Sequence, residues 1–435
     1  MSTQLLEPIL TGGIQNTHFF NGRLLTADAL RDEQDAQRRV HEALGKAVGA
    51  GIVSGLTVSQ SVLTTEGNVV HVAGGLALNW LGQVLTVPES GLEVTLHPGE
   101  ETAVTEAGLF GNCGTPTTDT PDLPLNAFIL ALSPASGFQG KAPMHALNDK
   151  GTLNGCGSRY AVAGIQFRLV GLDIDALTGI STETQDQLNA LLASDSDDPA
   201  RLARLRNMLA HLCFGTEELA GFAVDPFVQV SGVSNFGDYG ALGDIGLDDC
   251  DVPLALLHIT NKGIRFIDNW AARRRVTPAP LSPLWPLPTG ARRLAEGEAI
   301  FLQFQEQISQ VIQSNPATAV TLKATDYFRY LPPAGRLRLN AGAASGINAT
   351  AFFDGVPTPA TPIPLQGAHL LPLLQTACRF PPIDLAQGES VWLYRIEENA
   401  ESATAQPYLL FVSGHLPPLD DGRFDINRWD YFYFS

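Results

Sequence analysis

Residues 16–58 constrain the fold of this chain more than any other stretch. An aromatic segment, residues 18–26, leads into a polar helix-forming segment and then into the alternating residues of a strand. Thr26 is placed to cap the helix, and Asp28 lies in its first turn, where a negative charge suits the helix dipole. Gly49 is placed to end it. We therefore expect a one-sided helix between an aromatic segment and a β-rich body.

The helix carries its apolar residues at roughly helical spacing, at Leu30, Ala36, Val40, Ala43, Leu44, Ala47 and Val48. Leu24 and Leu25 are placed to staple the entering chain onto the helix. Residues 1–20 form an expected docking arm, whose apolar side chains have no clear secondary structure of their own: Leu5, Leu6, Ile9, Leu10 and Ile14. An apolar arm needs a surface to lie on.

Two placements remain open for the aromatic anchor, which comprises His18, Phe19, Phe20, Leu24 and Leu25. These side chains can pack under the helix of their own chain, or they can bind another subunit. A second candidate interface lies near the C-terminus, where alternation predicts a closing strand that presents Trp429, Tyr431 and Tyr433.

Composition limits the partners. The chain has 435 residues and a formal charge of -18, which disfavours nucleic acid and anionic membranes as partners. No apolar run is long enough to span a bilayer, and the first residues lack the basic start of a secretory signal. We expect cytoplasmic synthesis without membrane insertion. The five cysteines show no paired spacing, so free thiols are expected, although a disulfide or shared metal between Cys113 and Cys156 is conceivable.

Alternating apolar residues, separated by glycine and proline turns, predict a mainly β (α+β) chain with two sandwich-like or barrel-like domains. Residues 21–277 form a helix plus a β domain, with an αα-hairpin inserted at about 178–215 and capped by Ser181 and Asp198. Within it, residues 134–157 are expected as a surface loop. A proline-rich linker at 278–290 precedes a C-terminal β-sandwich domain at 291–435, in which residues 294–314 fit a helix, with a strand as the alternative around 300–304.

Motifs for catalysis are absent from the sequence. There is no Gly-x-Ser-x-Gly or His-Glu-x-x-His pattern, and the segment around Gly137 fails the phosphate-loop pattern at Ala135 and Ala142. The histidines are isolated from one another. The chain is expected to be no enzyme and to need no cofactor. The weak candidates for a metal site are Asp244, Asp248, Asp249 and Asp251, whose spacing is not that of an EF-hand and favours a solvated acidic loop.

Several segments resemble a family of phage tail-like proteins of contractile injection systems. The resemblance spans most of the chain and rests on the aromatic-Asn-Gly-Arg-Leu-Leu-Thr start, Gly49–Val58, Gly75–Pro88, Asp251–Leu257, Tyr327–Gly335 and Val391–Ile396. It implies a structural, non-enzymatic subunit in the baseplate, or in a fibre or spike attached to it. The implied partners are other baseplate or tail subunits, with the chain assembling as a homo-oligomer, for which a trimer is one option.

Two other functions stay open. A carbohydrate-binding or receptor-binding module of a tail fibre could use Trp392, Tyr394 and Trp429 to stack on sugars. A glycan hydrolase would need two carboxylates that face each other across a cleft, and no motif indicates such a pair.

Overall fold

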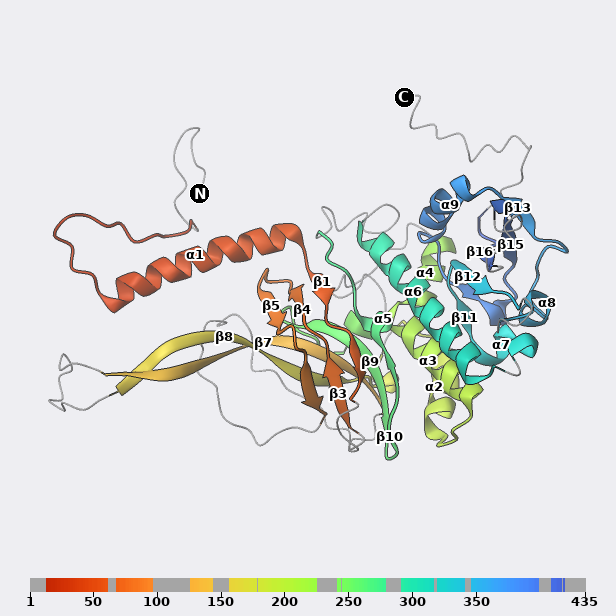
Figure 1. Ribbon diagram of the computed structural model, residues 1–435, viewed down its shortest axis with the longest axis horizontal. Coiled ribbons are helices and arrows are strands. Elements are labelled where there is room, and N and C mark those ends of the chain that lie inside the picture. Colours follow the sequence, from red (N-terminus) through yellow and green to blue (C-terminus); the bar gives the residue numbers. More distant parts are fainter. Residues whose placement is uncertain are drawn as a thin grey trace, which may run out of the picture.

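The computed structural model describes residues 13–61, 68–96, 126–143, 156–177, 179–224, 241–243, 245–278, 291–316, 319–340, 346–398, 408–416 and 418 (Figure 1). The N-terminal helix α1 (Ala27–Val48) begins where the sequence predicts: the Thr26 side chain accepts a hydrogen bond from the amide of Ala29. Asp28 lies in its first turn and Lys46 in its last, and both charges suit the helix dipole. Gly49 ends the helix with a positive φ of 107°.

Two small antiparallel sheets follow α1. One has the order β1 (Gly51–Gly55), β4 (Gly75–Leu78), β5 (Val84–Val87), and the other has the order β2 (Val58–Gln60), β3 (Val69–Val72), β6 (Leu92–Thr95). Their inward side chains form one hydrophobic core with alternate residues of a third, larger sheet, including Phe128, Leu130 and Leu132. These residues carry the period-2 pattern of strands that bury a face.

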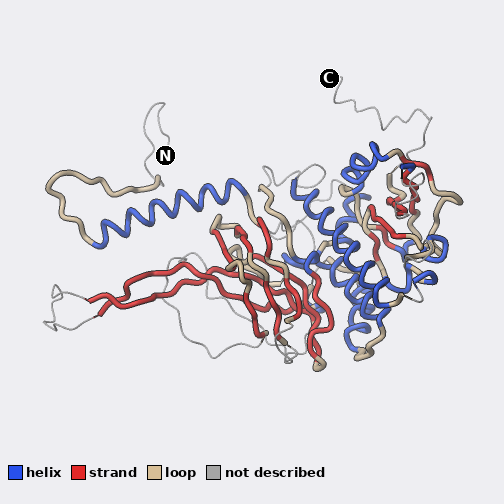
Figure 2. Tube along the Cα trace, in the orientation of Figure 1, coloured by secondary structure: helices blue, strands red, loops and turns tan. Residues whose placement is uncertain are grey.

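The third sheet has four antiparallel strands in the order β10 (Gly263–Asp268), β9 (Val252–Thr260), β7 (Ala127–Pro143), β8 (Cys156–Gly171). β9 pairs only with the first part of β7, from Ala127 to Leu132. Beyond that point β7 and β8 continue as a two-stranded ribbon up to the pair Pro143 and Cys156, away from the body (Figures 1 and 2). The expectation of a loop over 134–157 is therefore wrong for residues 134–143 and 156–157.

Helices cover the other face of this sheet. They are η1 (Ile174–Ala176), α2 (Thr182–Ala193), α3 (Pro199–Cys213), η2 (Ala241–Gly243) and α5 (Asn269–Ala272), and α4 (Thr216–Val224) packs against α3. Ser181 and Asp198 cap α2 and α3 as predicted, and Pro199 stands in the first turn of α3. Two helices therefore lie within the expected range 178–215, and α4 follows them in the chain. Ala127, Ile129 and Leu256 of the sheet pack against these helices.

The C-terminal part opens with α6 (Ala291–Ser314), so the strand alternative around 300–304 is wrong. It continues with η3 (Ala319–Thr321), α7 (Ala324–Tyr327), α8 (Ala349–Phe352), η4 (Gly367–His369), α9 (Leu370–Ala377) and η5 (Leu385–Gln387). A four-stranded sheet has the order β12 (Ala334–Arg338), β16 (Tyr408–Ser413), β15 (Val391–Ile396), β13 (Ile363–Leu365), and β11 (Tyr330–Leu331) pairs with β14 (Ile383–Asp384).

Helices cover both faces of the C-terminal sheet, where a β-sandwich was expected. Leu409 and Phe411 of β16 pack in a cluster with Phe304 of α6, whereas Leu410 and Val412 pack in a cluster with α9. Because β16 is buried on both faces, its sequence is a continuous apolar run. That pattern is the same whether a second sheet or helices cover the strand. Over the residues that the structure describes, the fold is mixed α+β, 37% helix and 33% strand, with several small antiparallel sheets and no closed barrel.

The proline-rich linker proposed at 278–290 lies almost wholly outside the described residues, and the division at that point stays a prediction. Side chains of α6 pack in two hydrophobic clusters. Ala299 and Ile300 belong to the cluster that contains α3, and Phe304 and Ile308 belong to the cluster of the C-terminal sheet. Within the described residues, no helix combines the length and the apolar character that crossing a bilayer requires.

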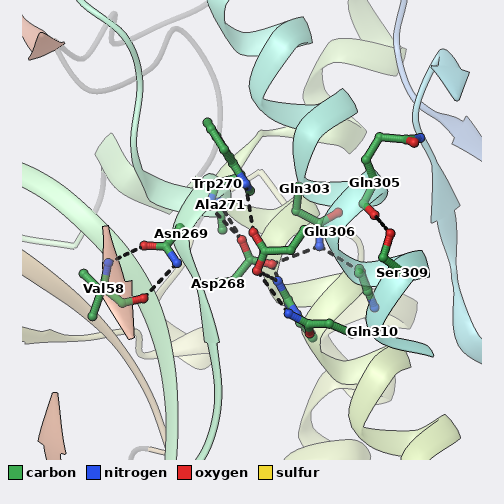
Figure 3. A network of polar contacts seen from close by, with 12 residues as sticks. Val58, Asp268, Asn269, Trp270, Ala271, Gln303, Gln305, Glu306, Ser309 and Gln310 are labelled. Atoms are coloured by element: carbon green, nitrogen blue, oxygen red, sulfur yellow. Dashed lines mark hydrogen bonds and ion pairs between the residues drawn. The ribbon is translucent and has the colours of Figure 1, made fainter. Parts of the chain in front are cut away.

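A buried polar network holds α3, α5 and α6 together (Figure 3). Asp268, at the end of β10, is fully buried and accepts hydrogen bonds from Arg206 Nε at 2.6 Å and Gln303 Nε2 at 3.0 Å. Its other oxygen accepts from the amides of Trp270 and Ala271, both at 2.9 Å, and so caps α5. The carboxylate of Asp268, at the end of β10, therefore binds groups from all three helices, α3, α5 and α6.

The guanidinium of Arg206 completes the network. It also donates to Glu306 of α6 at 3.1 Å. Burial alone would lower the pKa of Arg206, but the charges and hydrogen bonds of Asp268 and Glu306 outweigh it and raise that pKa above its ordinary value. The neighbouring Asn207 accepts from the amides of Arg329 and Tyr330, both at 2.9 Å, which ties α3 to β11.

We expect Arg206→Met to destabilise the protein by about 3–5 kcal/mol, since it leaves the carboxylate of Asp268 buried without its ionic partner. The free energy of unfolding, measured in urea, checks this. Arg31→Ala is the control, because it breaks only the exposed ion pair with Asp28 and should cost less than about 0.5 kcal/mol. Equal stability of the two variants would contradict the prediction.

Candidate interface surface

The helix α1 contacts the body near its C-terminal end, backbone against backbone. A Cβ atom on Gly45 would overlap the carbonyl group of Gly82, and one on Gly49 would overlap that of Thr277. Glu42, one turn earlier, accepts a hydrogen bond from Gln83 at 3.3 Å. From this contact the helix extends along the longest axis of the molecule, toward the same end as the β7–β8 ribbon (Figure 1).

A second face of α1 carries exposed apolar side chains. They are Leu30, Val40, Leu44 and Val48, and 60% of Leu44 is exposed. At 100° per residue, Val40, Leu44 and Val48 line up along one side, on a face other than that of Gly45 and Glu42. We call these four residues the α1 stripe. Its exposure in a 22-residue helix is the pattern of an amphipathic helix that lacks a partner on its apolar side.

Residues 13–26 lie along the first turns of α1. The Thr17 hydroxyl donates to the carbonyl of Ala29 at 2.8 Å, and its amide donates to Glu33 at 3.2 Å. The ring of His18 stacks with that of Phe20 at a centroid distance of 5.9 Å. The segment is therefore attached to the helix through polar groups and backbone.

The side chains of the aromatic anchor point outward. Phe20 is 60% exposed and Leu24 is 81% exposed, and Phe19 and Leu25 are also exposed. The alternative in which they pack under the helix of the same chain is therefore wrong. The staple is not formed either, because Leu25 and Leu30 are both exposed. Leu5, Leu6, Ile9 and Leu10 lie outside the described residues, as do Trp429, Tyr431 and Tyr433.

The ribbon adds two exposed rings that the sequence analysis missed, Phe138 and Tyr160. They lie on adjacent pairs of the β7–β8 register, since Phe138 faces Ala161 and Gln139 faces Tyr160. The guanidinium of Arg159 lies 5.0 Å from the centre of the Tyr160 ring. Alternation within 134–143 could have indicated a strand, but Gly137 and Gly140 obscured it.

Of the acidic candidates for a metal site, Asp248 is exposed to solvent and Asp251 is not. Asp251 is buried, forms an ion pair with Arg168 at 2.7 Å and accepts from the hydroxyl of Ser133. The backbone amide of Asp248 also donates to Asp251, at 2.8 Å. The carboxylate of Asp251 therefore organises the turn before β9. Asp249 is part of that turn, and Asp244 lies outside the described residues.

Among the residues that the structure describes, no three His, Cys, Asp or Glu side chains come together as a metal site. The expectation of free thiols fails at Cys250, which is disulfide-bonded. Cys213 and Cys378 are free thiols, and burial raises the pKa of Cys213 to about 12, which keeps it protonated and unreactive.

A pocket between α2, α3 and α4 is lined by the titratable side chains of His211, Glu217 and Tyr330. Burial alone would raise the pKa of Glu217, but hydrogen bonds from Thr184, Ser181 and Tyr330 hold it below its ordinary value. Burial lowers the pKa of His211 to about 3, and its Nδ1 lies 2.8 Å from the hydroxyl of Thr216. The cavity measures about 20 Å³, room for about one water molecule.

Two of the three aromatic residues proposed for sugar stacking, Trp392 and Tyr394, make contacts within the fold. Tyr394 is fully buried, and the indole of Trp392 donates to the carbonyl of Leu416 at 2.8 Å. Trp429, the third of them, lies outside the described residues. The exposed apolar surface of the described part is instead concentrated at the anchor and the α1 stripe.

Comparison with protein-family models gave no match for this chain, and comparison with curated proteins gave none either.

We expect Gly45→Ala to loosen α1, although alanine ordinarily stabilises a helix by about 1 kcal/mol relative to glycine. The added methyl group would overlap the backbone of Gly82 and separate the helix from the body. Hydrogen exchange of the α1 amides and of residues 79–83 measures this. Slower exchange in the variant, as helix propensity alone predicts, would contradict the packing described.

Neutral His211 makes stability depend on pH. Its pKa is 6.5 when unperturbed and about 3 in the folded protein, so the unfolded state binds more protons between these values. The free energy of unfolding should therefore fall as the pH decreases below 6.5, by about 2 kcal/mol between pH 7 and pH 5. His211→Gln should remove that slope in urea titrations, whereas His41→Gln, exposed on α1, should retain it. The same slope in both variants would refute this assignment.

Proposed function

We propose that this chain is a structural, non-enzymatic subunit of a contractile injection particle, in the baseplate or attached to it through its N-terminal segment. The resemblance in sequence supplies the class of particle. The observation that carries the docking role is the exposure of Phe19, Phe20, Leu24 and Leu25 on a segment that is held along α1 by polar contacts.

Exposed side chains of this size have a physical cost. Each buried aromatic or leucine side chain gains roughly 1.5–3 kcal/mol relative to exposure. Exposed apolar patches mark protein contacts, and the anchor exposes two phenylalanines and two leucines within residues 19–25. In this proposal the anchor inserts into an apolar groove of a neighbouring particle subunit, and the body carries no chemistry.

We expect a variant with Phe19, Phe20, Leu24 and Leu25 all changed to serine to fold normally and to be lost from purified particles. These side chains contribute little to the core of the free chain, so its melting temperature should stay close to that of the wild type. Particle occupancy, measured by mass spectrometry and electron microscopy of particles from the producing strain, checks this.

The matched control changes Val53 and Val84 to serine. These two valines are exposed apolar residues of β1 and β5, away from the anchor. This variant should join particles at the wild-type level. Wild-type occupancy of the anchor variant would overturn the docking role, and particles that form normally without the chain and never contain it would overturn the proposed function.

A further inference from the structure

A groove lies between two open sheet edges. Within the described residues, β2 has β3 as its one strand neighbour, and β10 has β9. The groove between β2, β10 and α6 measures about 510 Å³, a size typical of ligand sites. An open edge carries unpaired backbone N–H and C=O groups, which are a template for a further strand.

A side-chain amide already binds one position of the β2 edge as a strand would (Figure 3). The amide of Val58 donates to Asn269 Oδ1 at 2.7 Å, and Asn269 Nδ2 donates to the carbonyl of Val58 at 2.9 Å. The backbones of Thr57 and Ser61 bond on the other side of β2, to residues 73 and 69. Because these directions alternate along a strand, the backbone groups of Gln60 face the same side as those of Val58. Gln60 is therefore placed to pair with an added strand.

Apolar and polar side chains line the groove together. Ile264 and Phe266 of β10 form an apolar part, while Ser59 and Gln60 of β2 and Gln310 of α6 supply hydroxyl and amide groups. Such a lining suits side chains with an apolar ring and one polar group, which are tyrosine and tryptophan.

The two charged side chains that line the groove are both paired. Arg265 forms an ion pair with Asp197, and Glu306 forms one with Arg206 at 3.1 Å. The groove therefore favours a strand whose inward side chains are uncharged.

We propose that residues 429–434 of a second copy of this chain bind in this groove as an added strand. The segment has no proline and consists mostly of residues that favour strands. One face of the strand combines aromatic rings with N–H and O–H groups: Trp429, Tyr431 and Tyr433. The ten residues 419–428 precede it and reach about 35 Å when extended, which is enough to bridge to a neighbour.

The position of α6 favours a second copy over the same chain. Glu306 and Gln310 line the groove, whereas Phe304 and Ile308 pack in the cluster of the C-terminal sheet. At 100° per residue these pairs lie on opposite faces of the helix. Figure 1 shows α6 between the β-rich body and the C-terminal sheet, whose strand β16 precedes the segment. A neighbour's segment reaches the groove without passing around α6.

Sedimentation velocity on the full chain at micromolar concentrations tests the proposal, with association expected for the wild type. Deletion of residues 429–435 should abolish it. Gln60→Pro removes an edge N–H group and should weaken association by at least about tenfold. Ser59→Trp, which fills the groove, should do the same, whereas Ser90→Trp, at an exposed serine outside it, should not. Melting temperatures of the variants check that each is folded.

Competition identifies the bound segment. A synthetic peptide of residues 427–435 should dissociate the wild-type oligomer, and the same peptide with Tyr431→Pro should not. A monomeric wild type, a truncated chain that still associates, or wild-type affinity in both groove variants would overturn the proposal. These measurements use the purified chain alone, so their outcome is independent of the particle occupancy that tests the anchor.

Discussion

The ion pair between Arg206 and Asp268 is the interaction on which the rest of the structure depends. Burying two charges is costly, and the cost is offset here because each oxygen of Asp268 accepts hydrogen bonds from a different element. Arg206 and its neighbour Asn207 stand on one turn of α3 and bind opposite parts of the molecule, the end of β10 and the start of β11. One helical turn therefore connects the β-rich body to the two-stranded sheet of β11 and β14 in the C-terminal part.

Local signals in the sequence were sufficient for α1, α2 and α3. Thr26, Ser181 and Asp198 are short polar residues before apolar periodic segments, and each accepts the expected capping hydrogen bond. The ribbon was missed because strand pairing there depends on backbone hydrogen bonds between two segments, with glycine and serine in place of the buried alternation that marks a strand. The C-terminal sheet was read as part of a sandwich because a strand buried on both faces does not reveal what covers it.

The candidate interface could be predicted only in part. The apolar spacing of α1 and the aromatic anchor are visible in the sequence, but whether Leu25 contacts Leu30 is decided by the path of the entering chain, which Thr17 sets through Ala29 and Glu33. Asp251 was misread because its ionic partner Arg168 lies 83 residues earlier in the chain. Partners that are distant in sequence turn an apparently acidic loop into a buried structural element.

The contact of Gly45 with Gly82 has a mechanical consequence. The 22 residues of α1 span about 33 Å, and the helix meets the body near one end, where the backbones of Gly45 and Gly82 are in contact beside the hydrogen bond from Gln83 to Glu42, so it has the geometry of a lever with its pivot there. A tilt of about 10° at the pivot would move the far end by about 6 Å. Small rearrangements of the loop that carries Gly82 would thus be amplified into large displacements of whatever the aromatic segment holds.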